Sequence, residues 1–495
     1  MAAPTQAPPA TSASPEFIRG IGPLAAVSLV VGSMIGSGIF IVSADIGRQV
    51  GTWGPGALLI VWVVTGAMTV TGALAYAELA AMMPRAGGQY VFLREGLSPL
   101  AGFLYGWTLF AVIQTGTIAA VAVAFARFLS VLVPGLSPDV FLPLGQIHLP
   151  GSQDAIQLGL SAQRVVAILS ILVLTAINIR GVTLGAAIQT VFSVAKVGAL
   201  AVLVVFGLTF FRQPDIAAAN FSNLWGTGDW SLAVVPVLGA AMVGSLFSSD
   251  AWNNVTFAAA EVQNPTRNLP RALAIGTGTV SLLYILANVA YLNILPFHGD
   301  PNGSDVLSRG LQYAAQDRVG TAAIEVVLGT GAATVMAVAI LLSTFGCNNG
   351  LILSGPRVYY AMARDRLFFD KVGTLHPTFR TPVIALVLQA IWASILCISG
   401  TYNQLLDYVI FAALVFYFLT TLALFRLRRI RPDLPRPVRA FGYPVLPAVY
   451  MMAVAAIMVI LLVQRPLYTG CGLAIVAIGI PVYWLWRRLA ASPAA

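Results

Sequence analysis

Two glycine- and serine-rich stretches interrupt long apolar segments of the chain, Gly32-Ser33-Met34-Ile35-Gly36-Ser37-Gly38 and Gly244-Ser245-Leu246-Phe247-Ser248-Ser249-Asp250. In hydrocarbon, unpaired backbone N–H and C=O groups are costly, so unwound backbone at membrane depth persists where it lines a cavity or is buried in protein. A pair of interrupted spans at corresponding places in two halves of a chain is typical of a transporter with its binding site near the bilayer midplane.

The composition predicts a polytopic membrane protein. Of the 495 residues, 58% are hydrophobic and 9% are charged, and the mean hydropathy is +0.86, which no ordinary soluble domain shows. Apolar stretches of about 20 residues or more are long enough to span the hydrocarbon core. We expect an all-α fold with twelve transmembrane helices near residues 22–48, 54–82, 98–131, 162–179, 185–210, 233–260, 270–294, 324–354, 381–400, 404–425, 444–464 and 470–486.

The two breaks fall in the first and sixth expected helices, so the chain divides into two units of five helices. Two tandem units with an odd number of helices must have opposite orientations in the bilayer, which predicts an inverted repeat with a site at the interface. We expect a disordered cytoplasmic tail over 1–18, the first repeat over 19–211, the second over 212–432, and two additional helices with the C-terminal tail over 433–495.

The formal net charge of +9 is distributed as a membrane topology requires. With both termini in the cytoplasm, most of the lysines and arginines fall on the cytoplasmic side, as the positive-inside rule predicts. We therefore expect a multi-pass protein of the cell membrane and no nucleic-acid partner. The run from Arg426 to Arg439 is a basic cytoplasmic loop in this topology, and contact with anionic lipid head groups is an alternative role.

Neither a metal nor a cofactor is expected. The histidines lie in connecting segments and the cysteines, within predicted spans, have no metal or redox spacing. These residues are His148, His298, His376, Cys347, Cys397 and Cys471. The lack of a His or Cys constellation argues against a membrane-embedded enzyme.

The first break offers hydrogen-bond donors. Gly36, Ser37 and Gly38 let a ligand approach the backbone closely, and the amide groups at the end of a half-helix suit a carboxylate. Close helix packing through Gly32 and Gly36 is the alternative.

The second break places polar groups inside an apolar span, where a functional site is the default interpretation. Carbonyls released by unwinding can accept hydrogen bonds from an ammonium group, and Phe247 is a candidate gate. Asp250 has the alternative role of capping a half-helix. The residues concerned are Phe247, Ser248, Ser249, Asp250, Ala251, Trp252, Asn253 and Asn254.

Lys196 lies near the middle of the fifth expected helix, where burial of a charge is expensive. Its ammonium group can stand where a coordinated sodium ion would sit, with Ser343, Thr344 and backbone of the first break as expected partners. A purely structural lysine is the alternative. For Glu78, near the cytoplasmic end of the second helix, pairing with an arginine is favoured over proton coupling.

Several motifs together resemble the amino acid, polyamine and organocation (APC) superfamily, and within it the L-type amino-acid transporter (LAT) branch with its bacterial relatives. The motifs, in chain order, are Gly36-Ser37-Gly38-Ile39-Phe40, Tyr76 to Leu79, Pro84 to Tyr90, Lys196, and Phe247 to Trp252. The resemblance implies a LeuT-like fold and sodium-independent amino-acid transport. It also implies that backbone of Ile35, Gly36, Ser37 and Gly38 receives the substrate carboxylate and that carbonyls of Met34, Phe247 and Asp250 receive the ammonium.

The main functional hypothesis is exchange or uniport of neutral L-amino acids by alternating access. Proton-coupled uptake, or transport of cationic amino acids with Asp250 as counter-charge, is the alternative, and a channel is a further one. Animal members of the branch bind a heavy chain through an external cysteine after the third helix. Residues 132–161 contain none, so no such disulfide-linked partner is expected.

Overall fold

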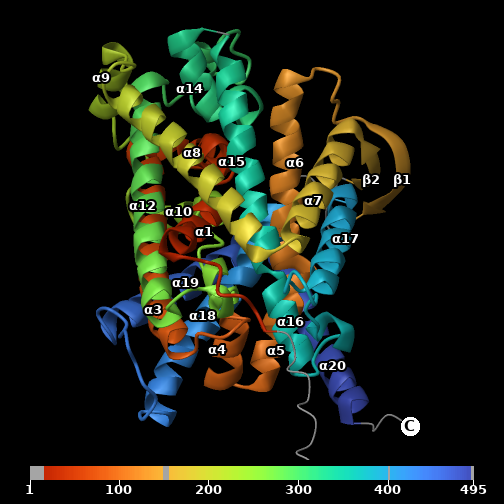
Figure 1. The fold of residues 1–495 in the computed structure, drawn as a ribbon. Coiled ribbons are helices and arrows are strands. Elements are labelled where there is room, and N and C mark those ends of the chain that lie inside the picture. The colour runs from red at the N-terminus through yellow and green to blue at the C-terminus, as the bar shows by residue number, and fades with distance from the viewer. Residues whose placement is uncertain (1–15, 149–154, 330, 400–401, 492–495) are drawn as a thin grey trace, which may run out of the picture.

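The computed structural model describes residues 16–148, 155–329, 331–399 and 402–491, most of which lie in a bundle of helices (Figure 1). Ten helices among the described residues are long and apolar enough to cross a membrane. The prediction of a helical, polytopic membrane protein is therefore confirmed. Most of the tail predicted over residues 1–18 lies outside the described residues.

The first half of the chain begins with a helix in two pieces. Two of its helices, α5 and α7, start at a serine cap: Ser98 Oγ accepts the N–H of Ala101 at 3.1 Å, and Ser161 Oγ accepts that of Arg164 at 3.2 Å. The helical elements are α1 Pro23–Met34, α2 Gly38–Gln49, η1 Gly51–Trp53, α3 Gly54–Met82, α4 Gln89–Gly96, α5 Pro99–Thr108, the π-helical turn η2 Leu109–Ile113, α6 Gln114–Leu132, α7 Ala162–Ile179, α8 Val182–Leu208 and α9 Pro214–Ser222.

The second half again begins with an interrupted helix. Its elements are α10 Val234–Ser248, α11 Asn254–Phe257, η3 Ala259–Glu261, α12 Pro265–Ile294, α13 Val306–Arg309, η4 Ala315–Asp317, α14 Val319–Leu328, α15 Ala332–Ser354, α16 Pro356–Arg364, η5 Asp370–Gly373, α17 Val383–Ser399, α18 Tyr402–Ile430, α19 Val445–Gln464 and α20 Pro466–Ala491.

The exact number of twelve spans and the inverted repeat stay predictions. Two of the expected spans, α10 with 15 residues and α17 with 17, are shorter than the other membrane-crossing helices. The span expected over 324–354 is divided, because Gly329 adopts a φ of +73° and ends α14 before α15 begins.

An antiparallel hairpin lies outside the helical bundle, in the segment 132–161 that connects the third and fourth expected helices. Strand β1, Val140–His148, pairs with β2, Ala155–Ser161, and two register shifts interrupt the pairing. The first strand is a short apolar run, a pattern that suits a strand as well as a helix segment. Its proline and glycine coincide with the irregular pairing.

The interrupted first helix occupies the centre of the bundle, whereas the last two helices lie at its edge. In the most apolar 18-residue stretch of Pro23–Gln49, 89% of the residues are buried. The corresponding share is 28% in Val445–Gln464 and 22% in Thr469–Arg488. Figure 1 shows α1 and α10 near mid-height, α9 and α14 at one end of the bundle, and α4 and α5 at the other. The two breaks therefore lie deep within the protein.

Candidate functional site

Both helix breaks are narrower than predicted. The first comprises three residues, since α1 continues to Met34 and α2 begins at Gly38. The second lies further along the chain than expected, because α10 includes Ser248 and the break runs over residues 249–253 before α11 begins at Asn254.

Local hydrogen bonds explain why the second break starts late. The Ser248 hydroxyl donates to the carbonyl of Gly244 at 2.8 Å, which satisfies a polar side chain without leaving the helix. After Ser248 the chain makes a tighter turn, in which the Asp250 N–H donates to the carbonyl of Phe247, three residues earlier, at 3.1 Å. The helix does not continue, because Ala251 adopts a φ of +63°. Phe247 and Ser248 thus belong to α10, and the role of Phe247 as a gate stays a prediction.

The two breaks touch one another. A methyl group added to Gly38 would lie 2.1 Å from Ser248 Oγ and 3.1 Å from its Cα, so only glycine permits this approach. The Tyr284 hydroxyl of α12 lies within hydrogen-bond distance of both breaks, 3.1 Å from the Met34 carbonyl and 3.2 Å from that of Ser248. Residues more than 200 positions apart in the chain therefore form one structural unit.

Lys196 reaches from α8 to the first break. Its ammonium group donates to the carbonyls of Gly32 at 2.6 Å, Ile35 at 2.7 Å and Ser343 at 3.2 Å, and the side chain is buried. Contact with the first break and with Ser343 was expected. The Thr344 hydroxyl instead donates within its own helix, to Ile340 at 2.9 Å or Leu341 at 3.1 Å.

Helix α15 satisfies further carbonyls of the first break. The Ser343 hydroxyl lies 3.1 Å from the carbonyls of both Ile35 and Gly36, and Cys347 Sγ donates to Ser33 at 3.0 Å. The carbonyls of this break thus face protein donors. At the start of α2 the Phe40 N–H donates to the Ser37 carbonyl at 3.0 Å, and this end of the helix carries the positive end of its dipole, which favours a carboxylate.

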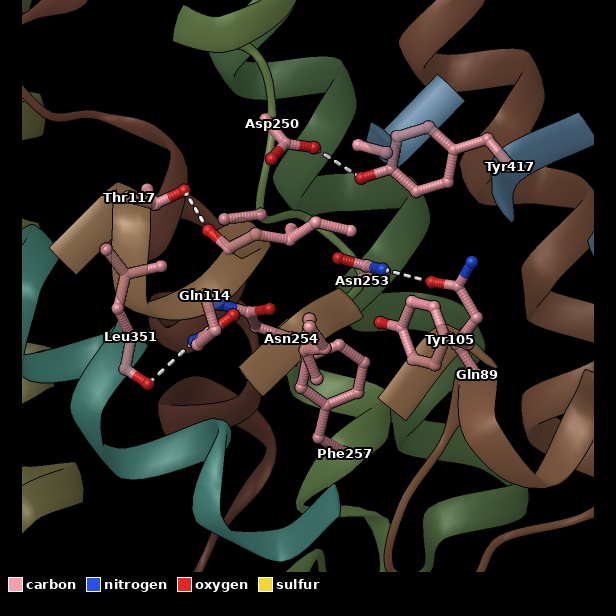
Figure 2. Close-up of a pocket in the computed structure, with 14 residues that line it drawn as sticks. Gln89, Tyr105, Gln114, Thr117, Asp250, Asn253, Asn254, Phe257, Leu351 and Tyr417 are labelled. Atoms are coloured by element: carbon pink, nitrogen blue, oxygen red, sulfur yellow. Dashed lines mark hydrogen bonds between the residues drawn. The ribbon is translucent and has the colours of Figure 1, made fainter. Parts of the chain in front are cut away.

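A narrow cavity of about 10 Å³, large enough for about one water molecule, lies beside the second break and is here named the central cavity (Figure 2). The Asn253 amide donates to Gln89 Oε1 at 2.6 Å, and that of Gln114 donates to the Leu351 carbonyl at 2.8 Å. The lining residues are Gln89, Tyr105, Leu109, Ile113, Gln114, Thr117, Asp250, Ala251, Asn253, Asn254, Phe257, Leu351, Ala413 and Tyr417.

Two polar groups of the central cavity have unmet hydrogen-bonding capacity. Tyr105 Oη and Asn254 Nδ2 are buried and have no partner among the described residues. Such groups are rare in folded proteins and are usually explained by water or a ligand. The π-helical turn Leu109–Ile113 forms one wall of the same cavity, and π-turns are frequent at functional sites.

Asp250 borders the central cavity and a second cavity of about 20 Å³, which Trp252 also lines. Its carboxylate accepts a short hydrogen bond from the Tyr417 hydroxyl, as Figure 2 shows. The Trp252 and Tyr417 rings stack with centroids 5.3 Å apart, and Tyr76 meets Trp252 edge-on at 4.7 Å. No lysine or arginine of the described residues forms an ion pair with Asp250.

The predicted site residues divide into two groups. Asp250 and Asn253 line the central cavity, and Asp250 and Trp252 line the second one. The others lie in the first break or at the helix ends beside the two breaks and are not among the residues that line either cavity; they are Met34, Ile35, Gly36, Ser37, Gly38, Phe247 and Ser248.

Sequence reasoning did not assign Gln89, Tyr105 or Tyr417 to the site. Gln89 lies in the Pro84–Tyr90 motif of the family resemblance, which implies no binding role for it. The two tyrosines give no sequence signal, because an aromatic residue in an apolar span is usually a packing residue.

Two buried ion pairs fix the end of the bundle that carries α4. Glu78 accepts from Arg428 at 2.9 and 2.5 Å and lies 3.3 Å from Arg436, so the expected pairing with arginine is confirmed. Glu261 accepts from Arg357 at 2.8 and 3.0 Å, and neither side chain is more than 1% exposed. These carboxylates are therefore engaged in structural pairs.

A helical membrane protein whose two broken helices meet beside a buried polar cavity has the architecture of a carrier of small solutes. The chain belongs to the amino acid permease family, whose model matches residues 21–482. It is a transporter of the LAT branch of the APC superfamily and not an enzyme.

Named relatives come from animals and bacteria. The chain is 31% identical to the "Large neutral amino acids transporter small subunit 2" of Homo sapiens, over 96% of this chain and 83% of the relative. It is 30% identical to the "Serine/threonine exchanger SteT" of Bacillus subtilis (strain 168), over 96% and 98%. It is 29% identical to the "b(0,+)-type amino acid transporter 1" of Mus musculus, over 85% and 78%.

Proposed function

We propose that this amino-acid transporter carries neutral L-amino acids by alternating access, as an exchanger or uniporter that does not require sodium. The observation that supports the proposal is the position of Lys196, whose ammonium group donates to the backbone carbonyls of Gly32 and Ile35 at or beside the first break and of Ser343 in α15. In carriers with discontinuous helices, unwound carbonyls are the ligands of a coupling sodium ion. In this chain the ammonium group of Lys196 lies among carbonyl oxygens of the same kind and is a cation that cannot dissociate.

The substrate lies between the breaks in this proposal, with its carboxylate on the amides of residues 36–38, since the Ile35 N–H expected to join them donates to the Val31 carbonyl at 2.9 Å. Its ammonium group binds the carbonyls of Met34, Phe247 and Asp250. The Met34 carbonyl already accepts one hydrogen bond from Tyr284, and the Phe247 carbonyl accepts from the N–H groups of Ser249 and Asp250. A carbonyl oxygen has two lone pairs, so Met34 retains an acceptor position for a substrate, whereas Phe247 must exchange a hydrogen bond. Because the breaks touch at Gly38 and Ser248, substrate entry requires them to separate.

We further propose that both termini are cytoplasmic, in the inner or plasma membrane, and that residues 19–211 and 212–432 are inverted repeats. The basic loop between α18 and α19 then faces the cytoplasm with α4 and α5. No disulfide-linked heavy chain is part of this proposal, since residues 132–161 contain no cysteine.

A second candidate function is transport of cationic amino acids, and Asp250 is the observation that favours it. Its carboxylate borders two cavities, is not ion-paired with any described residue, and lies beside the rings of Trp252, Tyr417 and Tyr76. A carboxylate next to aromatic faces suits an ammonium or guanidinium group.

Uptake into proteoliposomes separates these functions. The main proposal expects saturable uptake of neutral amino acids in sodium-free buffer, accelerated or unchanged by internal substrate and independent of a pH gradient. Uptake restricted to L-lysine and L-arginine identifies the second candidate. Strict dependence on sodium contradicts the assignment of Lys196, and uptake driven by an imposed pH gradient identifies proton coupling.

A further inference from the structure

A large cavity lies at the end of the bundle that carries α14, away from the helix breaks. It has a volume of about 450 Å³ and lies between the end of α6, α13, α14 and the start of α15; we name it the vestibule. Its lining residues are Val131, Ser304, Asp305, Val306, Arg309, Ala314, Ala315, Arg318, Thr321, Ala322, Glu325 and Ala333. In the proposed topology the vestibule faces the outside.

One face of α14 supplies a row of polar groups to the vestibule. Arg318, Thr321, Ala322 and Glu325 have the spacing of residues that share a helix face. Arg318 and Glu325 are separated by about 10 Å along the axis, at 1.5 Å per residue, and both side chains are long enough to reach the space between them. The row thus presents a cation at one end and an anion at the other.

Arg318 forms no ion pair within the described parts of the chain. The neighbouring carboxylate of Asp317 pairs instead with Arg48 at 2.6 Å, and no ion pair involves Arg318. Partial burial and the nearby Arg127 guanidinium lower the pKa of Arg318, although Glu325 acts in the opposite direction. An arginine remains charged under these conditions, so its surroundings favour the arrival of an anion.

Thr321 provides a second, independent observation in the same cavity. Its side chain is 8% exposed, and its hydroxyl is buried with no hydrogen-bond partner among the described residues. The hydroxyl lies one turn beyond Arg318 on the face that lines the vestibule. A ligand oxygen bound to Arg318 would also satisfy this group.

We propose that the vestibule is a second binding site for the zwitterionic head of an amino acid, with the carboxylate on Arg318 and Thr321 and the ammonium group on Glu325. This proposal rests on amino-acid transport as the function of the chain. The vestibule is connected to the first break through α14, since a methyl group on Gly320 would lie 2.8 Å from the Phe40 ring of α2. An amino acid held there is concentrated beside the half-helix that must move during transport.

The test is the number of amino-acid sites per chain, measured by equilibrium dialysis of the full-length protein in lipid nanodiscs. The probes are radiolabelled L-leucine and L-serine, used separately. The wild type is expected to bind two molecules of a transported probe. Arg318→Gln and Glu325→Gln are each expected to weaken one of the two sites by about tenfold or more, as the loss of a charge-assisted hydrogen bond implies. Arg212→Gln, at an exposed arginine of the α8–α9 connection, is the matched control and should retain both sites.

Chemical analogues separate a zwitterion site from an anion site. Isovalerate has the carboxylate without the ammonium group, and isoamylamine has the reverse, so each is expected to displace the probe only weakly from the vestibule. Isovalerate that competes as well as L-leucine identifies a plain anion site and overturns the proposal. A single site in the wild type, or two unchanged sites in Arg318→Gln, also overturns it. Failure of the proposed function is a different result, namely that wild-type proteoliposomes accumulate no amino acid.

Discussion

Replacement of Lys196 by alanine tests the interaction on which sodium independence depends. The substitution removes an ammonium group that donates to Gly32 at 2.6 Å, Ile35 at 2.7 Å and Ser343 at 3.2 Å. The Ile35 carbonyl retains the Ser343 hydroxyl at 3.1 Å. The Gly32 carbonyl, at the end of α1, loses its side-chain donor.

The expected loss follows from that single unsatisfied acceptor. A buried polar group left without its partner costs about 1–3 kcal/mol. This corresponds to about a 5- to 150-fold decrease in the population of the ordered first break, and uptake should fall by a similar factor. Because unwound carbonyls can coordinate sodium, high external sodium should partly restore uptake by Lys196→Ala while leaving the wild type unchanged.

The assay is uptake in proteoliposomes, normalised to the amount of inserted protein, with and without sodium. Lys371→Ala is the matched control, because Lys371 is the other lysine of the chain and lies exposed near the cytoplasmic end in the proposed topology. Sodium-free uptake by Lys196→Ala at the wild-type rate, with equal insertion, would refute the proposed role. If choline restores uptake by Lys196→Ala as much as sodium does, the carbonyls around the lost ammonium group do not coordinate sodium.

Three further substitutions test other parts of the structure. Asp250→Asn should retain uptake of neutral amino acids, because the proposed acceptor is the backbone carbonyl and not the carboxylate; loss of that uptake contradicts the proposal. Gly38→Ala should cost about 1–3 kcal/mol by overpacking against Ser248 and reduce the Tm, and added Ser248→Gly should restore part of the loss. Arg357→Met should cost about 3–5 kcal/mol of unfolding free energy by leaving the Glu261 carboxylate buried without its partner, and Glu261→Gln in the same chain should recover part of the Tm. An unchanged Tm in the single variants contradicts the assigned contacts.

The fold was predictable at the level of its membrane helices, because long apolar runs have few structural alternatives. The hairpin at residues 140–161 was not, since a short apolar run fits a strand or a helix equally well. The sequence predicts which two helices are broken and roughly where. The residues at which each break begins and ends depend on contacts between distant parts of the chain, which a local sequence pattern does not reveal. Ser248 stays helical through a hydrogen bond to Gly244, and Gly38 starts a new helix against a residue from the other half of the chain.

The site residues that could be predicted are polar or charged residues within apolar spans, where burial has a high free-energy cost. Lys196 and Asp250 are conspicuous in apolar spans, and each has polar partners in the structure. Tyr105, Tyr417 and Gln89 reach the central cavity only through the packing of α4, α5 and α18, which the sequence does not determine locally.

The most direct test of the central claim is counterflow of radiolabelled amino acids in sodium-free proteoliposomes. If the two helix breaks enclose one site that alternates between the two sides of the membrane, internal unlabelled L-leucine or L-serine should drive transient, saturable accumulation of the labelled compound above its external concentration. Gly38→Ala should reduce this accumulation in proportion to its effect on the contact with Ser248. Linear, non-saturable entry that is insensitive to internal substrate would contradict the account.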